Sequence, residues 1–196
     1  MKKLSISIIL LFITIFSFGQ SRGVNEVLDY PWAIGLGVNI VDNDGSGINQ
    51  PFDGSNWNFK NPVMLSGEYR VLNYLAINAA LSFNSLQMSN LQNELVLPEN
   101  KSFFAMDMSG KVYLDQFYAP TTRLKRVETY ALLGLGFTQV TDFNTGTFNA
   151  GVGVQFWFTN TYDLGLRLQT VGKWGFNKSI YLSNYIQHSA EVIYKF

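Results

Sequence analysis

Ten charged residues are spaced along the sequence so that their side chains could meet as ion pairs inside a narrow folded structure. Each lies in a segment in which polar and apolar residues alternate, and each occupies the polar parity of its segment. They are Glu68, Arg70, Asp107, Lys111, Asp115, Glu128, Asp163, Arg167, Glu191 and Lys195. An isolated buried ion is very costly, so charges enclosed together must form ion pairs. The pattern therefore predicts ion-pair chemistry rather than a lone reactive group.

Segments with a period of two must position these charges, because side chains in a strand alternate between its two faces. The segments are 32–41, 63–71, 75–84, 104–115, 128–139, 148–158, 162–169 and 186–196. Each is close to the ~9–11 residues of a tilted membrane strand. The pattern predicts an all-β chain that forms an eight-stranded antiparallel transmembrane up-and-down β-barrel, with the apolar faces outward.

The connections and the aromatic residues support this interpretation. Long connections at 42–62, 85–103, 140–147 and 171–184 alternate with shorter ones. Long outer loops and short periplasmic turns are typical of outer-membrane barrels, and an even strand count puts both termini in the periplasm. Aromatic residues gather at the ends of the segments, where the two membrane interfaces would lie. A soluble lipocalin-like barrel with its apolar face inward is the alternative, because alternation alone does not say which face is inside.

Within a barrel only wide enough for side chains to fill it, we expect one central network of charges. Arg167 and Lys111 should lie at its centre, because arginine can bridge carboxylates in a bidentate manner. Its expected acidic partners are Glu68, Glu128 and Glu191. Such a network would be a plug of ion pairs.

The amino terminus has the pattern of a secretory signal peptide: two lysines, an apolar stretch from Ile6 to Phe16, and then small residues. We expect a signal at 1–19, with cleavage around 19–21, a periplasmic segment at 20–31 and the barrel at 32–196. The formal net charge is zero, and removal of the signal leaves a slightly acidic chain. This balance gives no reason to expect a nucleic-acid partner.

The last strand carries a further signal. Val192, Tyr194 and Phe196 share its apolar face. The pattern resembles the carboxy-terminal sorting signal of Gram-negative outer-membrane barrels. That resemblance implies two partners, the barrel-assembly machinery during insertion and the lipids of the outer membrane, and it places the protein in the cell outer membrane.

The eight segments resemble the transmembrane domain of the OmpA and OmpX class. In OmpA-type proteins a peptidoglycan-binding domain follows the barrel, and the resemblance over 32–196 does not extend to one, so wall anchoring is not expected. The resemblance implies a small monomeric barrel with a structural or adhesive role through its outer loops, without catalysis. A narrow gated pore is the first alternative, and a lipid-modifying enzyme is the second.

Candidates for other chemistry are few. Some outer-membrane barrels that deacylate lipid A use a histidine and a serine two residues later, but Ala190 holds that position after His188, and Ser189 has the opposite parity. The sequence has no cysteine, which excludes disulfides and thiolate metal sites. The acidic and glycine residues after Asp42 lack the distant glutamate of a calcium-binding EF-hand loop. We therefore expect no catalytic residue, no metal and no cofactor.

Overall fold

The computed structural model describes residues 31–43, 54, 57–87, 91–92, 95–96, 99–118, 126–158, 163–177 and 184–196. The expected signal peptide lies outside the described residues, as does most of the expected periplasmic segment. The long strands are β1 (Trp32–Asp42), β3 (Val63–Leu72), β4 (Leu75–Leu86), β7 (Lys101–Tyr113), β8 (Val127–Val140), β9 (Phe143–Trp157), β10 (Leu164–Gly175) and β11 (Tyr185–Lys195). The short elements are β2 (Trp57–Asn58), β5 (Leu91–Gln92), β6 (Leu95–Val96) and α2 (Asp115–Tyr118).

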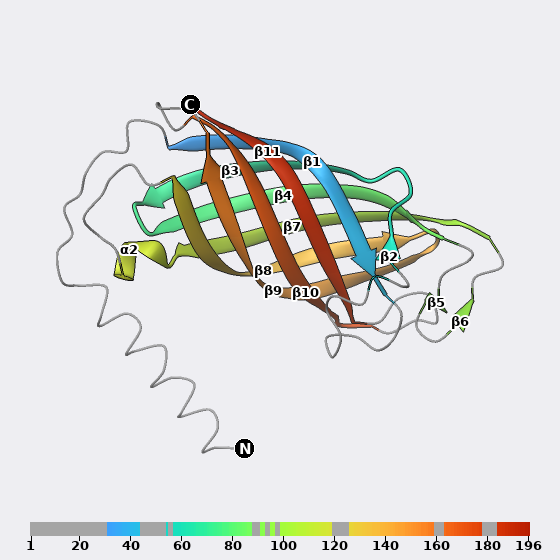
Figure 1. Ribbon diagram of the computed structural model, residues 1–196. Helices are drawn as coiled ribbons and strands as arrows, with labels where there is room; N and C mark the ends of the chain where they lie inside the picture. Colours follow the sequence, from blue (N-terminus) through green and yellow to red (C-terminus); the bar gives the residue numbers. More distant parts are fainter. Residues whose placement is uncertain are drawn as a thin grey trace, which may run out of the picture.

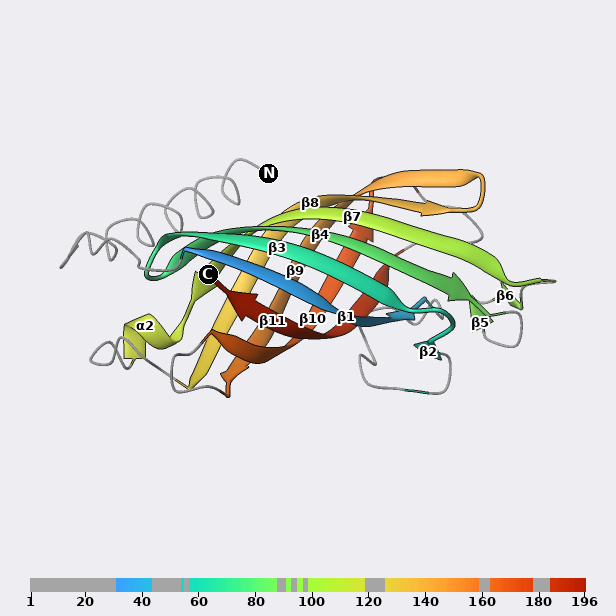
Figure 2. The same cartoon turned by 90° about the horizontal axis from the view of Figure 1, so that it is seen from above.

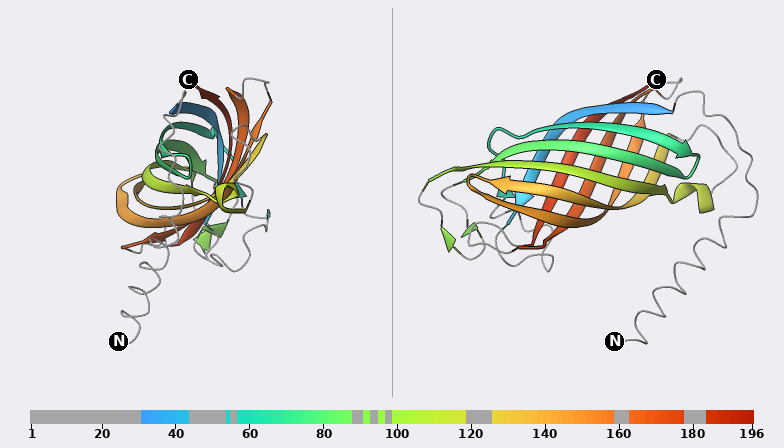
Figure 3. Two further views of the ribbon diagram at one scale, coloured as in Figure 1. Left: turned by 90° about the vertical axis from the view of Figure 1, so that its left-hand side faces the viewer. Right: turned by 180° about the vertical axis from the view of Figure 1, so that it is seen from behind.

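The long strands form a closed antiparallel barrel, which confirms the predicted fold class. Each strand pairs with the next along the chain, and β1 closes the ring by pairing with β11 from Ala33↔Lys195 to Asp42↔Ile186. The closed ring is visible in the end-on view of Figure 3. Closure matters because it leaves none of the long strands as an edge that could pair with another chain. No helix in the described part of the chain is long and apolar enough to cross a membrane.

The two ends of the barrel differ. Phe196, helix α2 and the turn between β3 and β4 lie at one end, and β2, β5 and β6 lie at the other (Figures 1 and 2). We call them the terminal end and the loop end. Aromatic pairs mark both: Trp32 packs on Tyr69 at the terminal end with ring centroids 4.6 Å apart, and Phe83 packs on Phe104 towards the loop end at 5.1 Å.

The outer surface is apolar and the interior is polar, as expected for a membrane barrel. The outward positions include Leu36, Met108 and Val152, which are 63%, 64% and 59% exposed. The inward positions on the same strands are buried and mostly polar or charged. A soluble barrel needs the opposite arrangement, with polar side chains facing the water around it. The lipocalin-like alternative is therefore wrong for this chain.

Several predicted strand boundaries shift by a few residues, and two are wrong by five or more. The connection expected at 140–147 is only the turn Thr141–Asp142, because β8 and β9 keep pairing up to Val140↔Phe143. Strand β10 was expected to end at Gln169 but continues to Gly175, paired with β9 as far as Thr147. In both places backbone hydrogen bonds extend the ladder over threonines and glycines, whose side chains carry little of the alternation that marks a strand. The second error hid an inward-facing lysine, Lys173.

Glycines let bulky interior side chains approach the barrel wall. Tyr130 on β8 lies opposite Gly153 on β9, and a Cβ added at Gly153 would collide with the phenol of Tyr130 and lie 2.9 Å from the carbonyl oxygen of Leu168. Tyr130 cannot retreat easily, because it is buried and its hydroxyl donates to Oε1 of Gln169 at 2.8 Å. The glycine is therefore needed for the packing of the interior.

We expect Gly153→Ala to lower the free energy of unfolding by about 1–3 kcal/mol, as overpacking of a filled core does. The matched control is Gly67→Ala, since Gly67 faces outward and a Cβ there would meet nothing within 4 Å. Urea titration of the refolded barrel in lipid vesicles would measure both. An equal effect of the two changes would contradict the packing role of Gly153.

Candidate functional site: the charged interior of the barrel

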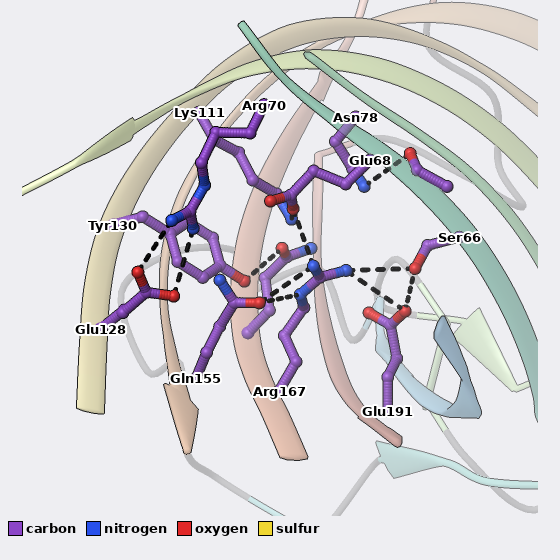
Figure 4. A network of polar contacts seen from close by, with 12 residues as sticks. Ser66, Glu68, Arg70, Asn78, Lys111, Glu128, Tyr130, Gln155, Arg167 and Glu191 are labelled. Atoms are coloured by element: carbon purple, nitrogen blue, oxygen red, sulfur yellow. Dashed lines mark hydrogen bonds and ion pairs between the residues drawn. The ribbon is translucent and has the colours of Figure 1, made fainter. Parts of the chain in front are cut away.

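Glu68 is the acidic hub of the interior. Its Oε2 lies 2.9 Å from Nζ of Lys111 and 2.7 Å from Nη2 of Arg167, so two cations share one carboxylate oxygen. Its other oxygen, Oε1, accepts a hydrogen bond from the hydroxyl of Tyr113. All four side chains are buried. Their residues come from β3, β7 and β10, so the contacts cross the lumen and tie distant strands together (Figure 4).

Arg167 connects this hub to a second carboxylate. Its Nη1 donates to Oγ of Ser66 at 3.1 Å and lies 3.7 Å from Oε2 of Glu191, and Ser66 in turn donates to Glu191. Its Nε and Nη2 both donate to Oε1 of Gln155, at 3.2 and 3.0 Å. The guanidinium is thus held on every side by acceptors. A group so placed has little freedom to change partners.

Glu128 lies beside a different arginine. The guanidinium of Arg70 donates to both of its carboxylate oxygens, at 2.9 and 3.1 Å, and Nε1 of Trp157 donates to one of them at 2.8 Å. Sequence reasoning expected Arg167 and Lys111 as the basic partners, but Arg70 takes that place (Figure 4). Arg70 also stacks on Tyr113, with Cζ 3.8 Å from the ring centroid. This stacking joins the Arg70–Glu128 pair to the hub.

Together these residues form a compact layer of ion pairs, which we call the charge plug. It contains the acids Glu68, Glu128 and Glu191 and the bases Arg70, Lys111 and Arg167, so its formal charge is zero. A balanced layer of this kind avoids the cost of unpaired buried ions. The remaining space is filled by Tyr113 and Tyr130, whose rings lie 5.7 Å apart.

A separate ion pair lies nearer the loop end. Nζ of Lys173 is 2.6 Å from Oδ2 of Asp107, and Nδ2 of Asn149 donates to Oδ1 of the same carboxylate at 2.8 Å. Lys173 was missed because β10 was expected to end before it. A longer period-two register through Val171 and Lys173 is the signal that could have found it.

Beyond this pair, apolar side chains close the interior. We call them the apolar cap: Val41, Leu86, Phe103, Ala105, Val140 and Tyr185, with Phe143 packed against them. All are buried except Phe143, and the rings of Phe103 and Tyr185 meet edge to face at 5.7 Å. An apolar interior at this end was not expected from the sequence. Its signal was the change from polar to apolar residues on the inward parity, as at Val41, Phe103 and Val140.

The other charges of the predicted inward set lie at the terminal end. Asp115 is buried at the start of α2, outside the strands, and Asp163 precedes β10. Lys195 stacks on Trp157, with Nζ 4.5 Å from the ring centroid. These three charges belong to the rim of the barrel rather than to its centre.

The residues of the predicted sorting signal lie on the outer surface of β11. Val192, Tyr194 and Phe196 are all exposed, and the rings of Tyr194 and Phe196 stack at 6.3 Å. The backbone of Phe196 exchanges hydrogen bonds with Trp32, at 2.9 and 3.2 Å. The last residue is thus part of the seam that closes the barrel.

His188 faces outward, as its parity predicts, and its Nδ1 lies 2.9 Å from Oγ1 of Thr170 on the neighbouring strand. Ser189 is buried on the opposite face of β11. The histidine–serine pair of a deacylase is therefore not formed here. Within the described residues, no three histidine or acidic side chains are arranged to hold a metal ion.

No family model matches the sequence, and no curated protein matches it. Solved structures do match. The N-terminal β-barrel domain of Pseudomonas aeruginosa OprF aligns with a TM-score of 0.51 at 11% identity, over 86% of this chain and 100% of that one. The chain has the fold of the small outer-membrane β-barrels.

Two further barrels show the same likeness. Neisserial surface protein A aligns with a TM-score of 0.52 at 16% identity, covering 85% of this chain and 97% of that one. Outer membrane protein AlkL, whose structure was determined in lipid bilayers, aligns with a TM-score of 0.53 at 11% identity, covering 90% and 93%. At such identities the likeness concerns the fold, and the sequences do not carry over any residue's role.

Proposed function

We propose that the protein is an integral outer-membrane barrel that acts as a closed, monomeric anchor for its outer loops, with a structural or adhesive role and no catalysis. The apolar outer surface supports the membrane location, because exposed apolar side chains such as Leu36 and Met108 suit lipid and not water. We infer that the terminal end of the barrel faces the periplasm and that the loop end faces the outside of the cell.

One observation carries the proposal of a closed anchor: the lumen is filled at two levels. The charge plug spans it with neutralised, multiply bonded ion pairs, and the apolar cap fills it nearer the loop end. An ion crossing the barrel would have to break the first layer and then pass the buried apolar side chains of the second, most of which offer no ligand in place of its hydration shell. The function then resides in the loops that the barrel presents.

Two experiments test the proposal. The first refolds the protein into planar bilayers and records current. The second compares the surface attachment of cells that carry the full chain with that of cells whose 87–100 loop is replaced by a short turn. We expect no current steps, and we expect surface attachment to fall with the loop replacement while the amount of folded barrel stays the same. Regular current steps would contradict the closed anchor. Unchanged attachment would contradict the adhesive role.

A narrow pore is the second candidate, and one observation favours it. The Asp107–Lys173 pair has a smaller set of partners than the charge plug, and the side chain of Asp107 keeps 13% exposure inside the barrel. A lumen that is partly open at this level could conduct if both closed layers rearranged. The same bilayer recording separates this candidate from the anchor. The third candidate is a lipid-modifying enzyme, and its support is the barrel architecture alone. A parallel assay for altered lipid A tests it.

Assembly should depend on the exposed aromatic end of β11. We propose that Val192, Tyr194 and Phe196 are read by the barrel-assembly machinery, and we expect Phe196→Ser to cut the amount of folded barrel in the outer membrane several-fold. Heat-modifiable gel migration of isolated membranes measures folded barrel. Phe158→Ser is the matched control, since Phe158 is also an exposed phenylalanine, follows the last residue of β9 and has no part in the seam. Wild-type amounts of folded barrel in the Phe196 variant would contradict the sorting role.

A further inference from the structure

The interior changes character in the same order along several strands. On β11, Glu191 belongs to the charge plug, Ser189 and Gln187 follow it, and Tyr185 belongs to the apolar cap. On β7 the order is Lys111, then Ser109 and Asp107, then Ala105 and Phe103. A middle level of uncharged polar side chains and one ion pair therefore lies between the two closed layers.

This middle level contains a cavity. The volume open to the centre of a water molecule is about 20 Å³, and the walls include Asp107, Asn149, Gln169, Lys173, Gln187 and Ser189. About 10–15 Å³ by this measure is enough to hold one water molecule. The cavity can therefore hold about one or two waters, and it is too small for an organic ligand.

Two buried oxygen atoms among the wall residues need a donor. Oδ1 of Asn149 and Oε1 of Gln187 accept no hydrogen bond from any other side chain or backbone group in the described part of the chain. Their residues are 1% and 3% exposed. The orientation of the Asn149 amide is fixed, because its Nδ2 must donate to Asp107. Leaving a buried acceptor unsatisfied costs about 1–3 kcal/mol, so an occupant that donates hydrogen bonds is strongly favoured.

The charge of the walls selects the occupant. Lys173 already supplies a cation to Asp107, at 2.6 Å, and would repel a metal ion. An anion would meet the acceptor oxygens of Asn149 and Gln187. Water can donate to both acceptors and still accept from a serine hydroxyl of the wall.

We propose that this cavity is an internal hydration site of the barrel, in which long-lived water donates to Oδ1 of Asn149 and Oε1 of Gln187. The charge plug lies between this site and the terminal end, and the apolar cap lies between it and the loop end. The Asp107–Lys173 pair is then a hydrated ion pair. This inference does not depend on the role of the loops.

The test is nuclear magnetic resonance of the full-length barrel refolded in lipid nanodiscs, with magnetisation transferred selectively from water to the side-chain amides. We expect cross-peaks of the sign typical of long-lived bound water at the amide protons of Asn149 and Gln187. The matched control is Gln155, which is buried to 1% exposure in the charge plug and whose amide donates to Tyr113 at 2.7 Å while its Oε1 accepts from Arg167. Its amide should show no transfer from water.

A variant sharpens the result. Gln187→Met removes the acceptor and keeps the length of the side chain, so we expect the water cross-peak at Asn149 to weaken at least twofold while the barrel remains folded by gel migration. Ser82 loses the hydrogen bond from Gln187 in this variant, so Ser82→Ala is measured beside it and should keep the cross-peak. No transfer at Asn149 and Gln187 in the folded wild type would overturn the proposal. Transfer of equal strength at Gln155, which does not line the cavity, would overturn the assignment of the water to this site.

Discussion

Replacing Glu68 with alanine is expected to lower the free energy of unfolding of the barrel by about 3–5 kcal/mol, among the largest losses for a single interior change. The variant leaves Lys111 and Arg167 buried without the carboxylate that both contact at 2.9 and 2.7 Å. Only Glu191, whose oxygen lies 3.7 Å from Arg167, remains to balance them. Urea titration in lipid vesicles, read by gel migration and tryptophan fluorescence, measures the loss.

A pair of double-mutant cycles locates the interaction. The cycle between Glu68→Ala and Arg167→Ala should show a coupling of about 1–3 kcal/mol, because the two side chains share a hydrogen bond. The cycle between Glu128→Ala and Arg167→Ala is the matched control and should be additive within about 0.5 kcal/mol. Its two residues do not pair with each other, because Glu128 accepts hydrogen bonds from Arg70 and Trp157 instead. A larger coupling in the control cycle than in the first would mean that the partners drawn here are wrong.

Charge on the outer surface should be costly at mid-height and tolerated at the rim. We expect Val152→Arg to lower the free energy of unfolding by about 2–4 kcal/mol, whereas Phe158→Arg should cost about 0–1 kcal/mol. Both residues face outward and both are 59% exposed, but Val152 lies midway along β9 and Phe158 follows its last residue. Because both variants introduce the same arginine at equally exposed positions, the difference between their losses reports depth in the membrane.

The same titration, run in vesicles, also checks the assignment of the faces. Ala80→Ser changes an inward position that is already surrounded by polar residues and should be mild. If Ala80→Ser cost more than Val152→Arg, the outer surface would not face lipid. Equal losses for Val152→Arg and Phe158→Arg would show that the barrel is not embedded at the height we infer.

The faces of the strands could be predicted from the sequence, because the period of two is a local property of an extended chain. Every member of the predicted central set, Glu68, Lys111, Glu128, Arg167 and Glu191, is buried in the barrel. The closed barrel itself was also predictable, since an open sheet edge is not tolerated in lipid. The identity of the ion-pair partners was not. Parity tells which side of the wall a residue faces, but not its height in the lumen.

Height depends on the stagger between strands, which only the closed ring fixes. The ring places Glu128 beside Arg70 and Trp157. It places the guanidinium of Arg167 within hydrogen-bond distance of Glu68, Gln155 and Ser66. It also extends β10 to Lys173, where backbone pairing with β9 overrides a weak local pattern. The sequence by itself thus determined which residues share the interior and which face outward. Only the tertiary structure decided which charges meet, where the lumen is filled and where a cavity remains, because those properties arise from contacts between strands far apart in the chain.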